Sequence, residues 1–413
     1  VWISGFTGAA GLVAVTEDHA GLWTDSRYFL QGEMELKGTG VELHKMLNQF
    51  GTPYIDFLAE NLSKGSRVAV NGLMFSKAVV DTMKKSFAES GIDLVYNQDL
   101  ISEIWTNSTP LSDAPIFYHD EKFSGSTIAD KFEQIRTTLK DNRADYHLIT
   151  TLDDIAWTFN IRGNDVMYNP VSVAYAIVGK SDAHIFVNEK KLTDEVKKQF
   201  SKNNIKIYPN SEIVGFLNKM KESEYILVDT QLCNQTIYDA INGKIIQGNS
   251  IPKFLKAIKN GTEIGHIRDV MKKDGAALAN TFYWLEQSLS SGQKINEVDV
   301  ARKLAEHRSQ QKFYQGESFG AIIGYNENGA IIHYHPEPET CKTIKPEGIL
   351  LVDSGGQYSD GTTDITRTFS LSQPTEEQVK AYTLILKGMI ALSMAKFPEG
   401  TTGGQLDTLA RQF

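Results

Sequence analysis

The sequence has few cysteines, no long apolar run and no excess of positive charge, and each absence excludes a class of protein. Its 413 residues include two cysteines, Cys233 and Cys341, which are too few for a disulfide framework and have no metal-ligating residues at short spacing. No apolar run approaches the length of a membrane-spanning helix, and no signal peptide precedes Val1. We therefore expect a cytoplasmic protein without a membrane partner.

Charge and composition exclude a further class of protein and indicate a globular fold. There are 42 basic and 51 acidic residues, giving a formal net charge of -9, whereas nucleic-acid binding requires a basic surface. Apolar residues make up 41% of the chain and charged residues 23%, values typical of globular proteins. A chain of this length is expected to form about three domains. The composition thus predicts a multidomain globular protein that does not bind nucleic acid.

The first two predicted domains have a similar order of elements. Residues 1–121 alternate strands and helices, starting with a strand at Val1, and residues 122–257 repeat the alternation. Segment 11–25 resembles segment 173–188 in its pattern, and segment 66–85 resembles segment 224–243, at an offset of about 160 residues. The repeat predicts two α/β domains of related fold.

The third predicted domain, residues 258–413, has a different order of elements. Apolar residues at helical spacing predict helices over 264–289 and 297–311, and strands and a hairpin follow before a further helix over 376–394. Helices and strands that are segregated in this way indicate an α+β domain.

The hairpin of this domain, residues 348–370, carries Asp353 and Asp364. If the turn is centred between Tyr358 and Ser359, the two aspartates face each other with Cβ atoms about 4.5–5.5 Å apart. Facing carboxylates repel unless they share a proton or a cation, so this register predicts a site for one or two divalent metal ions. A turn on Asp360-Gly361 would instead place Asp364 opposite Gln357 and away from Asp353. The alternative to a metal site is that Asp353 caps the end of its strand and Asp364 is a solvated turn residue.

The motifs around these residues resemble a known family. The chain is similar to the cytosolic-type Xaa-Pro aminopeptidases (aminopeptidase P) of the three-domain form. The similarity is carried by SGFTGAAG and WTDSRYFLQ in the first domain, TLDDIAWTFNIRGNDVMYNPV in the second, and NGAIIHYHPEPET and LVDSGGQYSDGTTDITRT in the third. These motifs span nearly the whole chain, and the last combines the carboxylate spacing with the surrounding family residues.

This resemblance implies a fold and a metal site. The fold would be two creatinase/prolidase N-terminal-type α/β domains followed by a pita-bread catalytic domain. Family members bind two divalent metal ions, usually Mn²⁺, and the match assigns Asp353 and Asp364 as ligands. The remaining histidine and two glutamates are expected after Phe413, so the 413-residue chain by itself is expected to be inactive and its pita-bread domain incomplete.

Two further residues gain a role from the resemblance. His333 matches a histidine that contacts substrate and stabilises the transition state; the alternative is a capping or core histidine. Arg27 matches a position near the catalytic cleft in relatives, sometimes across a dimer, but an ion pair with Asp25 is the preferred interpretation.

The activity implied is release of the N-terminal residue from peptides with proline at the second position. A prolidase acting on Xaa-Pro dipeptides is one alternative. A pita-bread protein that binds peptides or proteins without catalysis is another. Dimerisation is implied by family habit alone.

Overall fold

The computed structural model describes residues 1–108, 110 and 112–413. These residues form two compact units, each built from three segments of the chain. The first unit comprises Val1–Leu278, Ala305–Gly320 and Ser354–Asp364, and the second comprises Ala279–Leu304, Ala321–Asp353 and Ile365–Phe413. None of the helices in the described part of the chain is long and apolar enough to cross a membrane.

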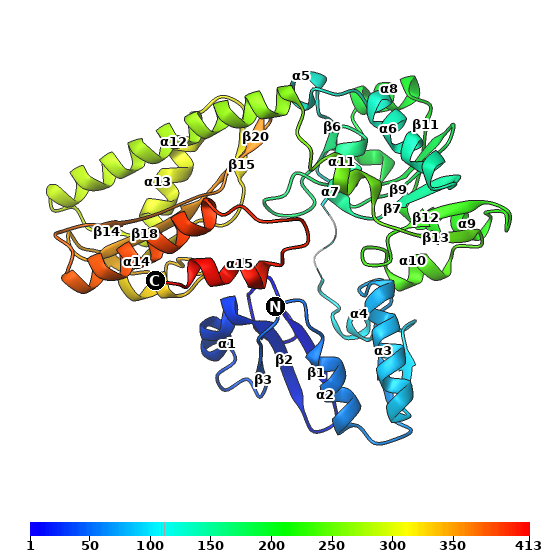
Figure 1. Cartoon of the computed structure of the whole chain (residues 1–413), viewed down its shortest axis with the longest axis horizontal. Helices are drawn as coiled ribbons and strands as arrows, with labels where there is room; N and C mark the ends of the chain where they lie inside the picture. The colour runs from blue at the N-terminus through cyan, green and yellow to red at the C-terminus, as the bar shows by residue number, and fades with distance from the viewer. Residues whose placement is uncertain (109, 111) are drawn as a thin grey trace. The chain divides into compact units, whose positions relative to one another are not determined.

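The N-terminal part of the first unit is an α/β module (blue to cyan in Figure 1). Strands β1 and β2 pair antiparallel, and β2 and β3 pair parallel. The elements are β1 (Leu12–Val15), β2 (Ala20–Asp25), α1 (Phe29–Glu35), β3 (Glu42–Met46), α2 (Pro53–Asn61), β4 (Arg67–Ala69), α3 (Lys77–Ser90), β5 (Asp93–Val95) and α4 (Leu100–Ile104).

The strand predicted at Val1 is absent, because the described structure has turns there. The amide of Gly5 donates to the carbonyl of Val1 at 2.7 Å, and Gly5 has a φ of 75°, a conformation that closes a turn and ends extended structure. The first strand of the chain therefore begins at Leu12.

A second α/β module follows in the same unit, built on a six-stranded sheet with the order β11-β10-β9-β7-β12-β13. Its strands are β7 (Tyr146–Ile149), β9 (Tyr175–Gly179), β10 (Ala183–Phe186), β11 (Ile205–Tyr208), β12 (Tyr225–Val228) and β13 (Lys244–Gln247). Its helices are α5 (Glu121–Ser124), α6 (Ile128–Asp141), α7 (Leu152–Thr158), α8 (Asp194–Lys202), α9 (Ile213–Asn218), α10 (Gln235–Asp239) and α11 (Ile251–Leu255), and β6 (Phe117–Tyr118) pairs with β8 (Ile161–Arg162).

Both faces of this sheet are covered by helices. Consecutive strand residues alternate between two apolar cores: Ile149 packs in the core that includes α6 and α8, and Leu148 packs in the core that includes α9 and α10. The sheet repeats the pairing of the first module, since β9 and β10 are antiparallel while β10 and β11 are parallel. The repeated order predicted from the sequence is present in the structure.

The rest of the chain holds the predicted helices, strands and hairpin. Helix α12 (Gly261–Ser290), the long helix in Figure 1, precedes α13 (Glu297–Ser309). The strands are β14 (Ile295–Asn296), β15 (Tyr314–Glu317), β16 (Ile322–Tyr325), β17 (Thr343–Ile344), β18 (Ile349–Ser354), β19 (Gly356–Tyr358), β20 (Gly361–Thr362) and β21 (Ile365–Ser370). A 3-10 turn, η4 (Asn326–Ala330), follows β16, and helices α14 (Glu376–Ser393) and α15 (Gly403–Ala410) come last.

Candidate metal centre

Asp353 lies near the end of β18, where the apolar run of this strand meets a glycine turn. Its Cα is paired with that of Ile322 in the neighbouring strand β16. Its Oδ1 is buried, and no group in the described part of the chain forms a hydrogen bond with it. Because a buried carboxylate oxygen without a partner is costly, this atom is suited to a cation.

Asp364 is exposed and directly precedes β21, which neighbours β18 in the three-stranded sheet β16-β18-β21. One aspartate therefore lies near the end of β18, and the other just before the adjacent strand begins.

The turn of the hairpin differs from both registers considered for it. Strands β19 and β20 pair Tyr358 with Gly361 and Gln357 with Thr362, so the two turn residues are Ser359 and Asp360. The turn between Tyr358 and Ser359 and the turn on Asp360-Gly361 are both wrong, each by one residue. Asp360 is held by an ion pair with Lys273 of α12 at 2.8 Å, a contact that the hairpin sequence does not encode.

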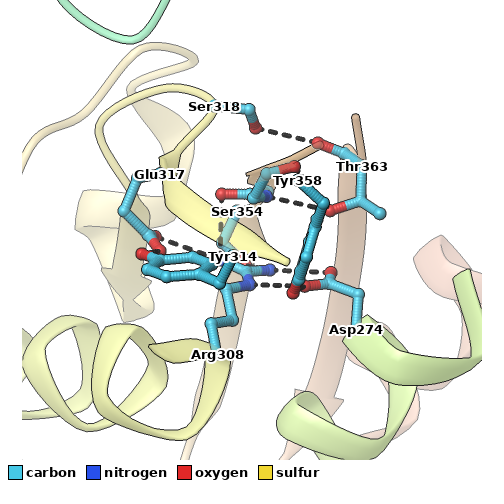
Figure 2. Close-up of polar contacts among 10 residues, drawn as sticks. Asp274, Arg308, Tyr314, Glu317, Ser318, Ser354, Tyr358 and Thr363 are labelled. Carbon is cyan, nitrogen blue, oxygen red and sulfur yellow. Dashed lines mark hydrogen bonds and ion pairs between the residues drawn. The ribbon is translucent and has the colours of Figure 1, made fainter. Parts of the chain in front are cut away.

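A fully buried arginine, Arg308, connects the segment between the two aspartates to α12 and α13 (Figure 2). Its guanidinium has five N–H donors, and the structure gives it five hydrogen bonds. Two reach the carboxylate of Asp274, at 2.7 and 3.0 Å, and one reaches Glu317 at 3.1 Å. The other two reach Ser354 Oγ at 3.1 Å and the carbonyl of Gly355 at 3.2 Å.

Two tyrosines complete the partners of Asp274, which is buried, and of Glu317, which is half-buried. The hydroxyl of Tyr358 donates to Asp274 Oδ1 at 2.8 Å, and the hydroxyl of Tyr314 donates to Glu317 Oε1 at 2.7 Å. Burial raises the pKa of both tyrosines, and their carboxylate partners raise it further. Both phenols therefore stay protonated and act as donors.

The charges of this cluster influence one another. Burial alone would lower the pKa of Arg308, but the hydrogen bond to Asp274 and the charges of Glu317 and Asp274 outweigh it, and the net pKa is raised. Burial raises the pKa of Glu317, and the charge of Arg308 offsets part of this effect. Arg308 is thus a permanent cation that keeps two carboxylates in place.

Close backbone packing fixes the chain between the aspartates. The hydroxyl of Ser318 donates to the carbonyl of Thr363 at 2.8 Å, and the amide of Gly356 donates to Thr363 Oγ1 at 2.8 Å (Figure 2). A Cβ atom at Gly355 would lie 2.0 Å from the carbonyl oxygen of Thr363, so only glycine fits there. The residues next to Asp353 and Asp364 in sequence, Ser354 and Thr363, are both held by side-chain contacts.

His333 lies in the segment after η4, and a fully buried carboxylate anchors that segment. Glu297 accepts from the backbone amides of Tyr325 and Lys342, at 2.8 and 2.9 Å, and from the hydroxyl of Tyr334 at 2.7 Å. The side-chain amide of Asn328 adds bonds of 3.0 and 3.1 Å. The residue after His333 is thereby fixed to the start of α13.

Arg27 forms the ion pair that was preferred for it. Its Nε and one terminal nitrogen each donate to a different oxygen of Asp25, both at 2.7 Å. Asp25 is buried while 38% of the Arg27 side chain is exposed. The pair connects β2 to the turn that follows it, and contact of Arg27 with substrate stays a prediction.

Arg308, Asp274 and Glu297 were not among the residues predicted from the sequence, although the sequence holds a signal for the first two. Val300 and Leu304 are buried on α13, and Arg308 continues their four-residue spacing. Asp274 likewise falls between the buried residues Val270 and Leu278 of α12. A charge of each sign on two apolar helix stripes predicts a buried ion pair between the helices.

Comparison with known proteins agrees with this architecture. Residues 1–104 and 107–263 match two models described as Creatinase/Prolidase N-terminal domain, and residues 265–413 match Metallopeptidase family M24. The class is therefore that of pita-bread metallopeptidases preceded by two creatinase/prolidase N-terminal domains, and the predicted fold is confirmed.

Three similar proteins indicate which family within this class the chain resembles. Aminopeptidase P2 of Arabidopsis thaliana is 37% identical over 99% of this chain and 62% of its own length. Xaa-Pro aminopeptidase 1 of Dictyostelium discoideum is 36% identical over 99% of this chain and 67% of its own. The crystal structure of X-prolyl aminopeptidase from Caenorhabditis elegans, described as a cytosolic enzyme with a di-nuclear active site, superposes with a TM-score of 0.94 at 33% identity, covering 100% of this chain and 68% of that one.

The chain belongs to the Xaa-Pro aminopeptidase (aminopeptidase P) family. It spans about two thirds of the length of these relatives, and 62% of the Arabidopsis protein.

Proposed function

We propose that the whole protein is a metal-dependent aminopeptidase that releases the N-terminal residue from peptides with proline at the second position. The observation that carries the proposal is the buried, unpartnered Oδ1 of Asp353, within the motif that resembles the family's metal-binding hairpin. The relatives named as Xaa-Pro aminopeptidases support the substrate class. The di-nuclear site of the Caenorhabditis structure supports two metal ions.

Asp353 and Asp364 are the residues of this chain that would hold the metal. Their carboxylate oxygens are hard donors, which suit Mn²⁺ and other hard divalent cations. Two divalent ions in such a site supply Lewis-acid activation of water and of the scissile carbonyl. The identity of the metal as Mn²⁺ is part of the proposal.

The other residues of the chain orient these ligands and the substrate. Arg308 holds Ser354 and Gly355, which directly follow Asp353, so its role is to position that carboxylate. His333 is proposed to donate a hydrogen bond to the charge that develops on the scissile carbonyl oxygen. Glu297 keeps the segment of His333 in place through Tyr334. Arg27 is a secondary proposal for substrate contact.

The cellular location and the oligomeric state of the enzyme are also part of the proposal. The cytosolic description of the Caenorhabditis enzyme supports a cytoplasmic location, and family habit supports a homodimer. Sedimentation analysis of the full-length protein would measure the oligomeric state.

The test compares substrates of two lengths. Full-length protein with Mn²⁺ should cleave the first residue from Xaa-Pro peptides of three or more residues, and Asp353→Asn and Asp364→Asn should abolish this activity. Asp141→Asn, at an exposed site on α6, is the matched control that retains it. Activity confined to dipeptides would instead identify a prolidase, and peptide binding without cleavage would identify a non-catalytic protein.

Residues 1–413 alone provide a second test. The resemblance assigns three further ligands to positions after Phe413, so this chain should bind Mn²⁺ weakly and hydrolyse nothing. Robust Xaa-Pro cleavage by residues 1–413 would refute that assignment of ligands.

A further inference from the structure

Two histidines and a glutamate converge on the three-stranded sheet of the N-terminal module. Glu42 and His44 are two residues apart in β3, so their side chains leave the strand on the same face. His44 is paired with Trp23 of the adjacent strand β2, and His19 directly precedes β2. Strand pairing thus brings His19 and His44, which are far apart in sequence, to one place.

The nitrogens of the two imidazoles face each other. Nε2 of His19 lies 3.0 Å from Nε2 of His44, and Nδ1 of His19 lies 3.8 Å from a carboxylate oxygen of Glu42. One ligand atom from each residue can be chosen so that all three lie within 4.8 Å of one another. Both histidines are half-buried, and Glu42 is exposed.

An aromatic wall fixes the orientation of the imidazoles. The ring of Trp23 stacks on His44, with centroids 4.1 Å apart and an angle of 13° between the planes. The ring of Phe57 lies 4.9 Å from His19 and 5.2 Å from His44. A site with such fixed ligands loses little conformational entropy when it binds an ion.

The two Nε2 atoms form an N–H···N hydrogen bond in which one imidazole donates and the other accepts, and a metal ion can take the place of that hydrogen once the donor ring changes tautomer. Two imidazole nitrogens bound to one tetrahedral Zn²⁺ lie about 3.3 Å apart, given Zn–N bonds of about 2.0–2.1 Å. The rings would therefore separate by only a few tenths of an ångström from their 3.0 Å contact. Burial lowers the pKa of His44, Glu42 opposes this effect and His19 adds to it, so the neutral form that a metal needs is favoured.

We propose that His19, His44 and Glu42 form a binding site for a divalent transition-metal ion such as Zn²⁺, separate from the centre at Asp353 and Asp364. Two imidazole nitrogens and one carboxylate oxygen are a known donor set for Zn²⁺, with water in the fourth position. Binding requires the imidazole that donates in the His19–His44 hydrogen bond to carry its proton on Nδ1, so that both Nε2 lone pairs face the ion. The ion connects the turn before β2 to β3 and stabilises the N-terminal module.

The experiment follows metal binding to the 413-residue chain in the Asp353→Asn background, which weakens the other centre. Addition of Co²⁺ should produce the visible absorption typical of four-coordinate cobalt, and Zn²⁺ should displace the cobalt. His44→Gln and His19→Gln should each remove the cobalt absorption. Glu42→Gln should lower the affinity by about 10- to 100-fold if the carboxylate only orients His19, and by more if it binds the metal.

The controls distinguish a lost site from a lost fold. His335→Gln removes an exposed histidine elsewhere and should leave the cobalt spectrum unchanged. The His19 and His44 variants should keep the metal-free melting temperature and circular dichroism of the parent, and only their Zn²⁺-dependent increase in melting temperature should disappear. Absence of the cobalt spectrum in the parent, or its persistence in either histidine variant, would overturn the proposal.

Discussion

The residue that defines the candidate centre most sharply is an arginine that does not itself bind metal. Arg308 uses each of its five donors on a different partner atom, and its planar guanidinium presents those donors in one fixed geometry. Lysine has three donors and no fork, so it cannot serve Asp274, Glu317 and the hairpin together.

Arg308→Lys should therefore destabilise the protein by about 3–5 kcal/mol, the range for breaking a buried ion pair, because a buried carboxylate loses its partner. Urea denaturation followed by circular dichroism measures this change. Arg302→Lys is the control on the same helix, since 73% of the Arg302 side chain is exposed in its pair with Asp299. Equal stabilities of the Arg308→Lys and Arg302→Lys variants would show that the buried guanidinium group does not contribute to stability.

A second residue-scale prediction concerns acid stability. His147 is fully buried in β7: its Nδ1 donates to the carbonyl of Leu227 at 3.1 Å, and its Nε2 accepts from the amide of Ile251 at 3.2 Å, so the ring is neutral. Burial lowers the pKa of His147 to about 4, whereas an unfolded histidine titrates near 6.5. The unfolded state then binds more protons between these values, and stability falls as the pH drops from about 6.5 to 4.

His147→Gln should reduce this pH dependence, by at most about 1.4 kcal/mol per pH unit. Melting temperatures of parent and variant measured from pH 7 to pH 4 provide the test. His335→Gln, at an exposed position, should keep the parental profile. If the melting temperature of His147→Gln depends on pH as steeply as that of the parent, other groups are responsible for the acid sensitivity.

At the scale of elements, one buried carboxylate organises the segment that carries His333. Glu297→Gln replaces an oxygen acceptor by an NH₂ donor, which would face the donors Tyr334 and Asn328. The free energy of local opening of this segment should therefore fall by about 1–3 kcal/mol, which is the cost of leaving a buried polar group without a hydrogen bond. Hydrogen exchange of residues 326–342 should accelerate, whereas Glu339→Gln, at an exposed glutamate of the same segment, should leave it unchanged. Equal protection in both variants would contradict the anchoring role.

The elements also show which structure can be predicted from spacing. Apolar periodicity was sufficient to predict α12, α13 and α14 and the hairpin, because each has a stripe or strand face that the sequence displays. The hairpin turn was missed by one residue, since Tyr358 and Asp360 are held by Asp274 and Lys273 from α12. Local spacing does not encode contacts from segments so distant in sequence.

Glu297 was missed for the same reason. A glutamate in the first turn of a helix is usually a favourable dipole interaction, and its burial depends on a segment some thirty residues later. Asp353 and Asp364 could be proposed from the sequence because their motif is local.

For the whole molecule, metal binding should appear as a gain in stability. A ligand that binds only the folded state adds about 2.7 kcal/mol at one hundred times its dissociation constant. Mn²⁺ should therefore raise the melting temperature of the full-length protein, and Asp353→Asn should remove the increase while Asp141→Asn retains it. An equal increase in both variants would place Mn²⁺ binding away from Asp353.

The fork of Arg308 also restricts how this part of the protein can change over evolutionary time. Asp274, Arg308 and Glu317 lie on three separate segments, and replacement of Arg308 alone by an uncharged residue leaves the carboxylates of Asp274 and Glu317 without their cation. A lineage that exchanges this cluster for apolar side chains, starting with the arginine, must pass through such an intermediate or alter the positions together. Relatives that lack the arginine at position 308 are therefore expected to lack the acidic residue at position 274 as well, because that carboxylate is fully buried.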